Sequence, residues 1–189
     1  MRKLLAAVAA AAALGGGAYA VTAFGASTQQ FVYGGGHYNA NFGPGNPTPP
    51  RDFSLAGTGS STNATGQLLI GLNQSGGGGG LSITVLCYSI SPNINASGGR
   101  TAVVGGTINN GSLAGDQAAF FVQDNTTPGG PAGLYDQASP LYAGTSGLIT
   151  VTKRGTTCPD PDATTVTPDG SSAPVLYSDV PYGDIVVSG

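Results

Sequence analysis

The chain has 189 residues, of which only 8% are charged, and its formal net charge at pH 7 is −3. It contains nine acidic residues, all of them Asp, against six Lys or Arg. A surface with so few cations cannot neutralise a phosphate backbone, which disfavours nucleic acid as a partner, and the lack of Glu and Lys on exposed positions disfavours a helical fold.

The first 20 residues have the pattern of a secretory signal peptide with a helical apolar region. Arg2 and Lys3 form a positive start, residues 4–14 are apolar, and Ala18 and Ala20 occupy the small positions of a cleavage site. The apolar run is shorter than the ~20 residues that a membrane span needs, so an uncleaved anchor is disfavoured. We therefore predict a secreted, extracellular protein whose mature form begins after Ala20 and has no membrane span.

Residues 21–51 are rich in Gly, Asn and Pro and show neither the helical nor the strand period over any useful length. This composition predicts a flexible or extended N-terminal segment. At most, residues 31–33 (Phe-Val-Tyr) are expected to add a short edge strand.

From residue 52 onward, apolar side chains recur at every second position in short segments separated by turn residues. Leu68, Ile70 and Leu72 share one face of the first clear segment, and the alternation over 81–87 places Cys87 on one face with Ile83 and Val85. Period two predicts strands, and the spacing of the turns favours one all-β domain over 52–189, either an antiparallel sandwich or a partly closed barrel. The predicted strands are 52–57, 65–73, 81–90, 101–109, 117–124, 147–154 and 183–187, with a hairpin tip at 76–80.

Two strands carry further detail. The second face of the 81–90 strand is also apolar in its far half, at Leu86, Tyr88 and Ile90, so that half is expected to be covered on both sides. Gly105 and Gly106 lie inside the 101–109 strand, where paired glycines predict a bulge or the close approach of another group.

The two cysteines, Cys87 and Cys158, are expected to form one disulfide in an oxidising compartment. It would close a loop of about 70 residues, a constraint on the order of 4 kcal/mol. A metal site is disfavoured because His37 is the only histidine, and a catalytic thiol is disfavoured because it would be oxidised outside the cell. The Asp-, Thr- and Pro-rich residues 159–174 that follow are expected to form a long loop or a disordered insertion.

Asp124 and Asn125 end the 117–124 strand and begin a turn that Pro128 and Gly129 complete. Their side chains are expected to accept hydrogen bonds from the nearby backbone. Calcium binding is the alternative, but no spacing in the sequence requires the acidic residues to converge. We predict no metal and no cofactor.

Residues 121–129, an apolar strand followed by Asp-Asn-Thr-Thr-Pro-Gly, and residues 147–151, Gly-Leu-Ile-Thr-Val, together resemble a small β domain of secreted bacterial proteins, the post-COAP type. Residues 183–187 are a second candidate for the closing strand. The resemblance covers residues 52–151 and implies a bacterial origin and an antiparallel β fold without catalytic residues to carry over. Thr126 and Thr127 replace its Gly-Glu, and Cys158 with the 159–174 segment departs from its pattern.

An enzyme is disfavoured. His37, the one histidine, lies in the segment expected to be flexible, and the chain has no Glu for a carboxylate pair. The sequence therefore predicts a non-catalytic structural or interaction module whose partner is a cell-envelope or extracellular protein or a polysaccharide, with a secreted hydrolase the weakest alternative.

A carbohydrate-binding module is the stronger alternative, because aromatic rings can stack on sugars. The candidate ligand-facing aromatics are Tyr135, Tyr142, Tyr177 and Tyr182, which fall in predicted loops. The competing interpretation is that these tyrosines cap the surface of a β domain.

Overall fold

The computed structural model describes residues 30–72, 80–95, 98–125 and 134–188. The signal peptide predicted at 1–20, its expected cleavage residues Ala18 and Ala20, and the turn residues 126–133 lie outside the described residues. So does all but Gly80 of the hairpin tip expected at 76–80.

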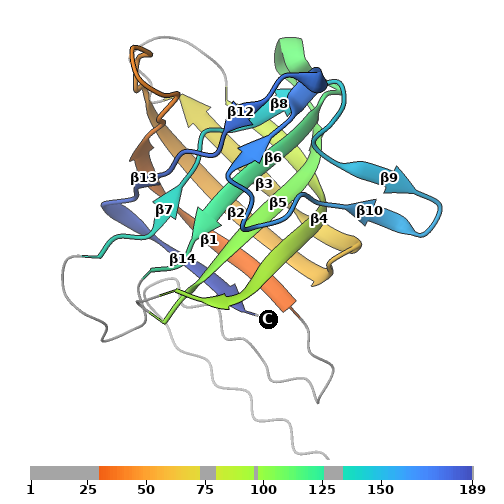
Figure 1. The fold of residues 1–189 in the computed structure, drawn as a ribbon, viewed down its shortest axis with the longest axis horizontal. Coiled ribbons are helices and arrows are strands. Elements are labelled where there is room, and N and C mark those ends of the chain that lie inside the picture. The colour runs from red at the N-terminus through yellow and green to blue at the C-terminus, as the bar shows by residue number, and fades with distance from the viewer. Residues whose placement is uncertain (1–29, 73–79, 96–97, 126–133, 189) are drawn as a thin grey trace, which may run out of the picture.

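The protein is all-β, as predicted, and its main sheet is antiparallel throughout and curls into a half-barrel (Figure 1). The sheet therefore takes the partly closed barrel form and not the sandwich. The strand order is β13-β7-β6-β5-β4-β3-β2-β1-β14, with β8 also pairing with β6. Its long strands are β1 (Gln30–Asn39), β2 (Pro50–Ser60), β3 (Asn63–Leu72), β4 (Leu81–Ile94), β5 (Arg100–Ile108), β6 (Gln117–Gln123) and β14 (Tyr182–Ser188).

The remaining elements are short. Three strands extend the sheet beyond β6, namely β7 (Gln137–Ala138), β8 (Tyr142–Gly144) and β13 (Ser178–Asp179). Two separate hairpins are formed by β9 (Thr150–Thr152) with β10 (Gly155–Thr157) and by β11 (Thr165–Val166) with β12 (Ala173–Pro174). Two short 3-10 helices are also present among the described residues, η1 (Gly111–Leu113) and η2 (Pro168–Gly170).

The expectation of a flexible or extended segment over 21–51, with a strand at most at 31–33, underestimates the order of residues 30–39. These residues form β1, which pairs with β2 on one side and β14 on the other. The glycines at 34–36 explain the error, because glycine is depleted in strands and suggested a loop. In the structure they permit close packing: a Cβ on Gly36 would lie 2.5 Å from Cγ1 of Val180 and 2.6 Å from the carbonyl oxygen of Tyr182. The strand at Phe31–Tyr33 is therefore longer than expected and internal to the sheet.

The concave face of the half-barrel holds the main hydrophobic core. Tyr38, Phe53 and Phe120 meet there, with ring centroids 5.4–6.2 Å apart. Aliphatic side chains from every long strand complete the core, including Val32, Leu55, Leu68, Ile83, Val85, Val104 and Ile185. The alternation predicted for Leu68 and Ile70 is confirmed, since both side chains are buried in this core.

A second, smaller core lies on the outer face of β5 and β6. Val103, Ala119 and Phe121 are covered there by Leu148 and Val166 from the segment that follows β8. The loop expected at 159–174 is thus not a free loop, because it contains β11, η2 and β12 and buries Val166. The 147–154 strand is also shorter than expected, with only Thr150–Thr152 paired, in the hairpin with β10. The last strand of the main sheet is β14, which includes the predicted strand 183–187.

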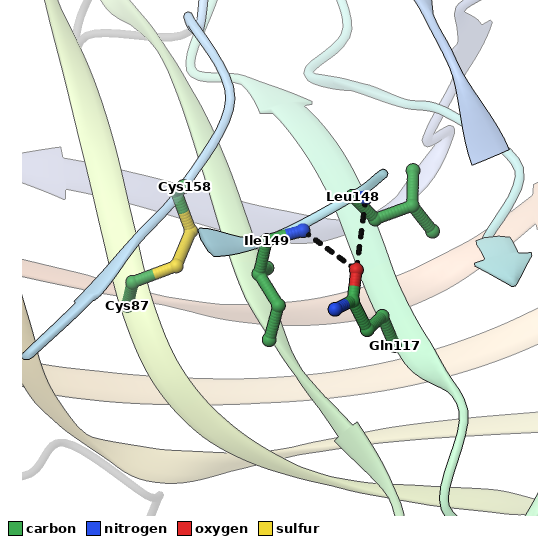
Figure 2. The surroundings of a disulfide bond; sticks show 5 residues. All are labelled: Cys87, Gln117, Leu148, Ile149 and Cys158. Atoms are coloured by element: carbon green, nitrogen blue, oxygen red, sulfur yellow. Dashed lines mark hydrogen bonds between the residues drawn. A yellow bond between two sulfur atoms is a disulfide. The ribbon is translucent and has the colours of Figure 1, made fainter. Parts of the chain in front are cut away.

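The predicted disulfide between Cys87 and Cys158 is present, with Cα atoms 5.5 Å apart (Figure 2). Cys87 does not share a face with Val85, because the register with β5 shifts between these two residues. This bulge at Leu86 turns Cys87 to the outer face and Tyr88 into the main core, and both are buried, so this part of β4 is covered on both sides as expected.

The register pairs Cys87 with Gly105, and the disulfide lies against that glycine. A Cβ on Gly105 would be 2.7 Å from Sγ of Cys158 and 2.6 Å from Cγ2 of Ile149. The close approach predicted for the Gly105–Gly106 pair is therefore confirmed at Gly105.

Candidate functional site

An open groove with both polar and apolar lining lies where β13 approaches β1, and it has a volume of about 560 Å³. Two of the four candidate ligand-facing tyrosines, Tyr135 and Tyr177, line it. They come from the segments before β7 and before β13. The other lining residues are His37, Tyr38, Asn39, Asn41, Thr48, Ser178, Asp179 and Pro181.

The two groove tyrosines differ in exposure. The side chain of Tyr135 is 48% exposed, so its ring is free to meet a ligand. Tyr177 is half-buried and also packs against the outer core. Burial and the neighbouring Tyr142 raise the pKa of the Tyr177 hydroxyl, so this group remains a neutral hydrogen-bond donor and acceptor at physiological pH.

The other two candidate tyrosines do not line the groove. The Tyr142 hydroxyl donates to the carbonyl of Pro174 at 2.8 Å and accepts from the Leu176 N–H at 3.1 Å, and its ring meets Phe121 edge-on. Tyr142 is thus a structural tie between β8 and the β12 region. Tyr182 is 76% exposed on β14, where it pairs with His37 across the strands.

The polar side chains of the groove are mostly neutral. Asp179 accepts from Nε2 of Gln137 at 2.9 Å, and His37 Nδ1 lies 2.8 Å from Oδ1 of Asp52. Hydroxyl, amide and imidazole groups, with the carboxylate of Asp179, therefore line the groove beside aromatic rings. This arrangement suits a ligand that carries many hydroxyl groups and little charge.

The sequence did not predict the contact between His37 and Asp52. Two parts of a Ser-His-Asp device are therefore present, and Ser178 lines the same groove. A nucleophile must lie within hydrogen-bond reach of its base, and no hydrogen bond joins Ser178 to His37 among the described residues. The geometry gives no support to the secreted-hydrolase alternative. Nowhere among the residues that the structure describes are three His, Cys, Asp or Glu side chains grouped so as to hold a metal ion.

Two buried aspartates act at the seam between the edges of the sheet. Asp136 accepts from the Ile185 N–H at 2.7 Å and from the Asn125 N–H at 2.8 Å, while Asp124 accepts from the Val187 N–H at 3.2 Å. These carboxylates accept hydrogen bonds from β14 main-chain N–H groups, as the carbonyl groups of a further strand would. The calcium alternative would need acidic side chains to converge. Asp116 precedes β6 and Asp124 follows it, so these two residues are separated by the length of that strand, roughly 25 Å.

Asp124 was expected only to begin a turn, but its carboxylate reaches across the half-barrel to β14. Asn125 is held in place as well, since its Oδ1 accepts from Asn95 at 2.7 Å and its amide donates to the Tyr135 carbonyl at 3.0 Å. Through that bond the seam also fixes the backbone that carries Tyr135 into the groove. Sequence alone gave no signal for these contacts, which join residues between 10 and 63 positions apart.

Over residues 30–72, 80–95, 98–125 and 134–188, no helix has the length and apolar character that crossing a membrane requires. The chain matches no protein-family model, and no curated protein and no solved structure is significantly similar to it.

Proposed function

We propose that the protein is an extracellular, non-catalytic binding module that takes a neutral saccharide in the groove between Tyr135 and Tyr177. The observation that carries the proposal is the convergence of these two tyrosines with hydroxyl and amide side chains on one open hollow. A sugar ring offers a C–H face that packs on an aromatic ring and hydroxyl groups at its edge that need hydrogen-bond partners.

The open shape of the groove favours a polysaccharide chain over an enclosed small molecule. Asn39 and Asn41 at one side and Ser178 and Asp179 at the other offer hydrogen-bond donors and acceptors along its length. A polysaccharide running through the groove would contact both tyrosines while its ends stay in solvent. Polysaccharide of a cell envelope or extracellular matrix is the ligand class that fits.

The extracellular location rests on two observations. The disulfide between Cys87 and Cys158 is of the kind that persists in oxidising compartments. The first 20 residues carry the charge, apolar run and small residues of a secretory signal.

Affinity electrophoresis of the oxidised protein through gels containing bacterial and plant polysaccharides tests the proposal. We expect at least one polysaccharide to retard the protein, and Tyr135→Ala to weaken that binding roughly 2- to 12-fold, the range that one aromatic contact supplies. Tyr182→Ala is the matched control, because it removes an exposed tyrosine that does not line the groove. Uniform mobility across a broad panel, or equal losses in the two variants, would overturn the saccharide proposal.

A further inference from the structure

A second hollow, of about 250 Å³, opens at one end of the half-barrel, where β1 and β3 end and β2 and β4 begin. Its walls are largely apolar and come from the sheet on one side and from η1 and the segment before β8 on the other. The apolar side chains that line it include Phe42, Ile70, Leu81, Leu113 and Leu141.

Two polar groups interrupt this apolar wall. Tyr38 and Arg51 are cross-strand partners in β1 and β2, and both line the cavity. The Tyr38 hydroxyl oxygen and Nη1 of Arg51 are buried, and neither has a hydrogen-bond partner among the described residues. The Tyr38 side chain as a whole is only 1% exposed. Both strands continue the alternation that points Phe53 into the core, which directs these two groups inward.

Unpartnered groups of this kind are costly. A buried hydroxyl without a partner costs about 1–3 kcal/mol, and a buried part of a guanidinium costs more. Native proteins leave few such groups, so each one calls for an explanation. A ligand that accepts hydrogen bonds from both groups would remove the cost at both positions.

The chemistry of the two groups defines that ligand. Arg51 is a permanent cation whose planar donors match a carboxylate. Burial raises the pKa of the Tyr38 hydroxyl, an effect that Arg51 only partly opposes, so Tyr38 remains a donor. A carboxylate accepts from both donors, and the apolar walls leave room only for hydrocarbon beyond it.

We propose that this cavity binds a small apolar monocarboxylate, with its carboxylate on Arg51 and Tyr38 and its hydrocarbon part against Ile70, Leu81 and Leu141. The volume limits the size of the ligand. It lies between the roughly 150 Å³ void that accommodates benzene and the roughly 300 Å³ at which pockets for drug-sized ligands begin. Octanoate and benzoate are therefore suitable probes. The proposal does not rest on the saccharide groove. Tyr38 lines both hollows, but Tyr135 and Tyr177, which the saccharide proposal requires, line only the groove.

Isothermal titration calorimetry of the oxidised chain with octanoate, acetate and 1-octanol is the first test. Octanoate should bind, and 1-octanol should bind roughly 10- to 100-fold more weakly, since it lacks the charge that Arg51 recognises. Acetate should also bind more weakly, because it fills none of the apolar space. No binding of octanoate, or octanol binding equally well, would overturn the proposal. Equal binding of acetate and octanoate would reduce the site to one for any small anion and would overturn it as well.

Substitutions form the second test. Arg51→Gln should weaken octanoate binding roughly 10- to 100-fold, whereas Arg154→Gln, which removes an exposed cation from the β9–β10 turn, should leave it unchanged. Tyr38→Phe should keep the fold, because it deletes an unpartnered hydroxyl, and should weaken binding roughly 10- to 100-fold, since the hydrogen bond lost is one to a carboxylate. Tyr38→Phe also decides the matter if Arg51→Gln does not fold. Two results together would refute the assignment of both residues: an octanoate affinity that is unchanged in Tyr38→Phe, and octanol that binds as tightly as octanoate.

Discussion

The carboxylate of Asp136 accepts a hydrogen bond from the main-chain N–H of Ile185 at 2.7 Å, across the seam between the two ends of the sheet. Asp124 repeats the contact two residues further along β14, at Val187. An unpaired strand edge is a site for unwanted pairing with other chains, and barrels avoid it by closing. In this protein, side-chain carboxylates perform part of that closure, which is why aspartate rather than an apolar residue is buried there.

Asp136→Ala is expected to lower the free energy of unfolding by about 2–4 kcal/mol. The substitution removes two hydrogen bonds to a charged acceptor and leaves the Ile185 N–H buried without one. Urea denaturation followed by circular dichroism measures the effect. Asp116→Ala is the matched control, since the Asp116 side chain makes no hydrogen bond to a described residue. If both variants unfold at the same urea concentration, the seam does not depend on this carboxylate.

Asp184 is expected to reduce stability at neutral pH. Partial desolvation of the Asp184 carboxyl, which remains exposed at its surface, and then the neighbouring Asp136 carboxylate raise the pKa of Asp184 above its ordinary value of 3.8. The folded protein therefore holds this proton more tightly than the unfolded chain, so the contribution to stability is greatest at low pH and falls as the pH rises through the raised pKa.

Asp184→Asn removes this pH-dependent loss of folding stability. The variant should be more stable than the wild type at pH 7, and the difference should shrink as the pH falls below 4. Denaturation midpoints measured between pH 3 and pH 7 test the expectation, and Asp116→Asn reports the effect of removing one carboxylate elsewhere. A constant difference between Asp184→Asn and the wild type across this range would contradict the expected carboxylate interaction.

The strands with clear alternation could be predicted from sequence because their pairing buries one face of each. This holds for the segments around Leu68 and Ile83, whereas the strand around Phe120 was predicted from a continuous apolar run that is buried on both faces. The disulfide followed from cysteine count and compartment. The face of the sheet on which the Cys87 side chain lies could not be predicted. A single inserted residue at Leu86 reverses the face that each later side chain of the strand occupies. Similarly, only residues 31–33 of β1 were predicted, because its glycines fit a strand only once β2 and β14 are in place.

The candidate site was predicted only in part. The sequence identified Tyr135 and Tyr177 as candidate ligand-facing residues, but it did not predict that both line one groove. They are 42 positions apart, and no local pattern fixes the distance between two loops. The cavity at Arg51 and Tyr38 was missed for a related reason. Arg51 falls in the segment expected to be flexible or extended, and only the register of β1 against β2 turns its side chain inward.

Gly105→Ala is expected to destabilise the oxidised protein by about 1–3 kcal/mol, because the added methyl group would overlap the disulfide and Ile149. Gly57→Ala is the matched control, since that glycine is also buried in a strand but a Cβ there would make only ordinary contacts at 3.7 Å or more. Thermal unfolding of both variants measures the difference. The cost of Gly105→Ala should fall when Cys87 and Cys158 are both replaced by Ala, and an unchanged cost would show that the sulfur atoms are not its cause.

Gln117 holds the segment that covers the disulfide. Its Oε1 accepts from the main-chain N–H groups of Leu148 and Ile149, both at 3.0 Å (Figure 2). Gln117→Ala leaves these two amides without their acceptor, so we expect a loss of about 1–3 kcal/mol and faster hydrogen exchange at both. Gln117→Glu keeps an acceptor at the same position and should preserve the protection. Hydrogen exchange measured by NMR separates the two variants, and exchange at Leu148 and Ile149 that stays slow in Gln117→Ala would show that packing alone holds this segment.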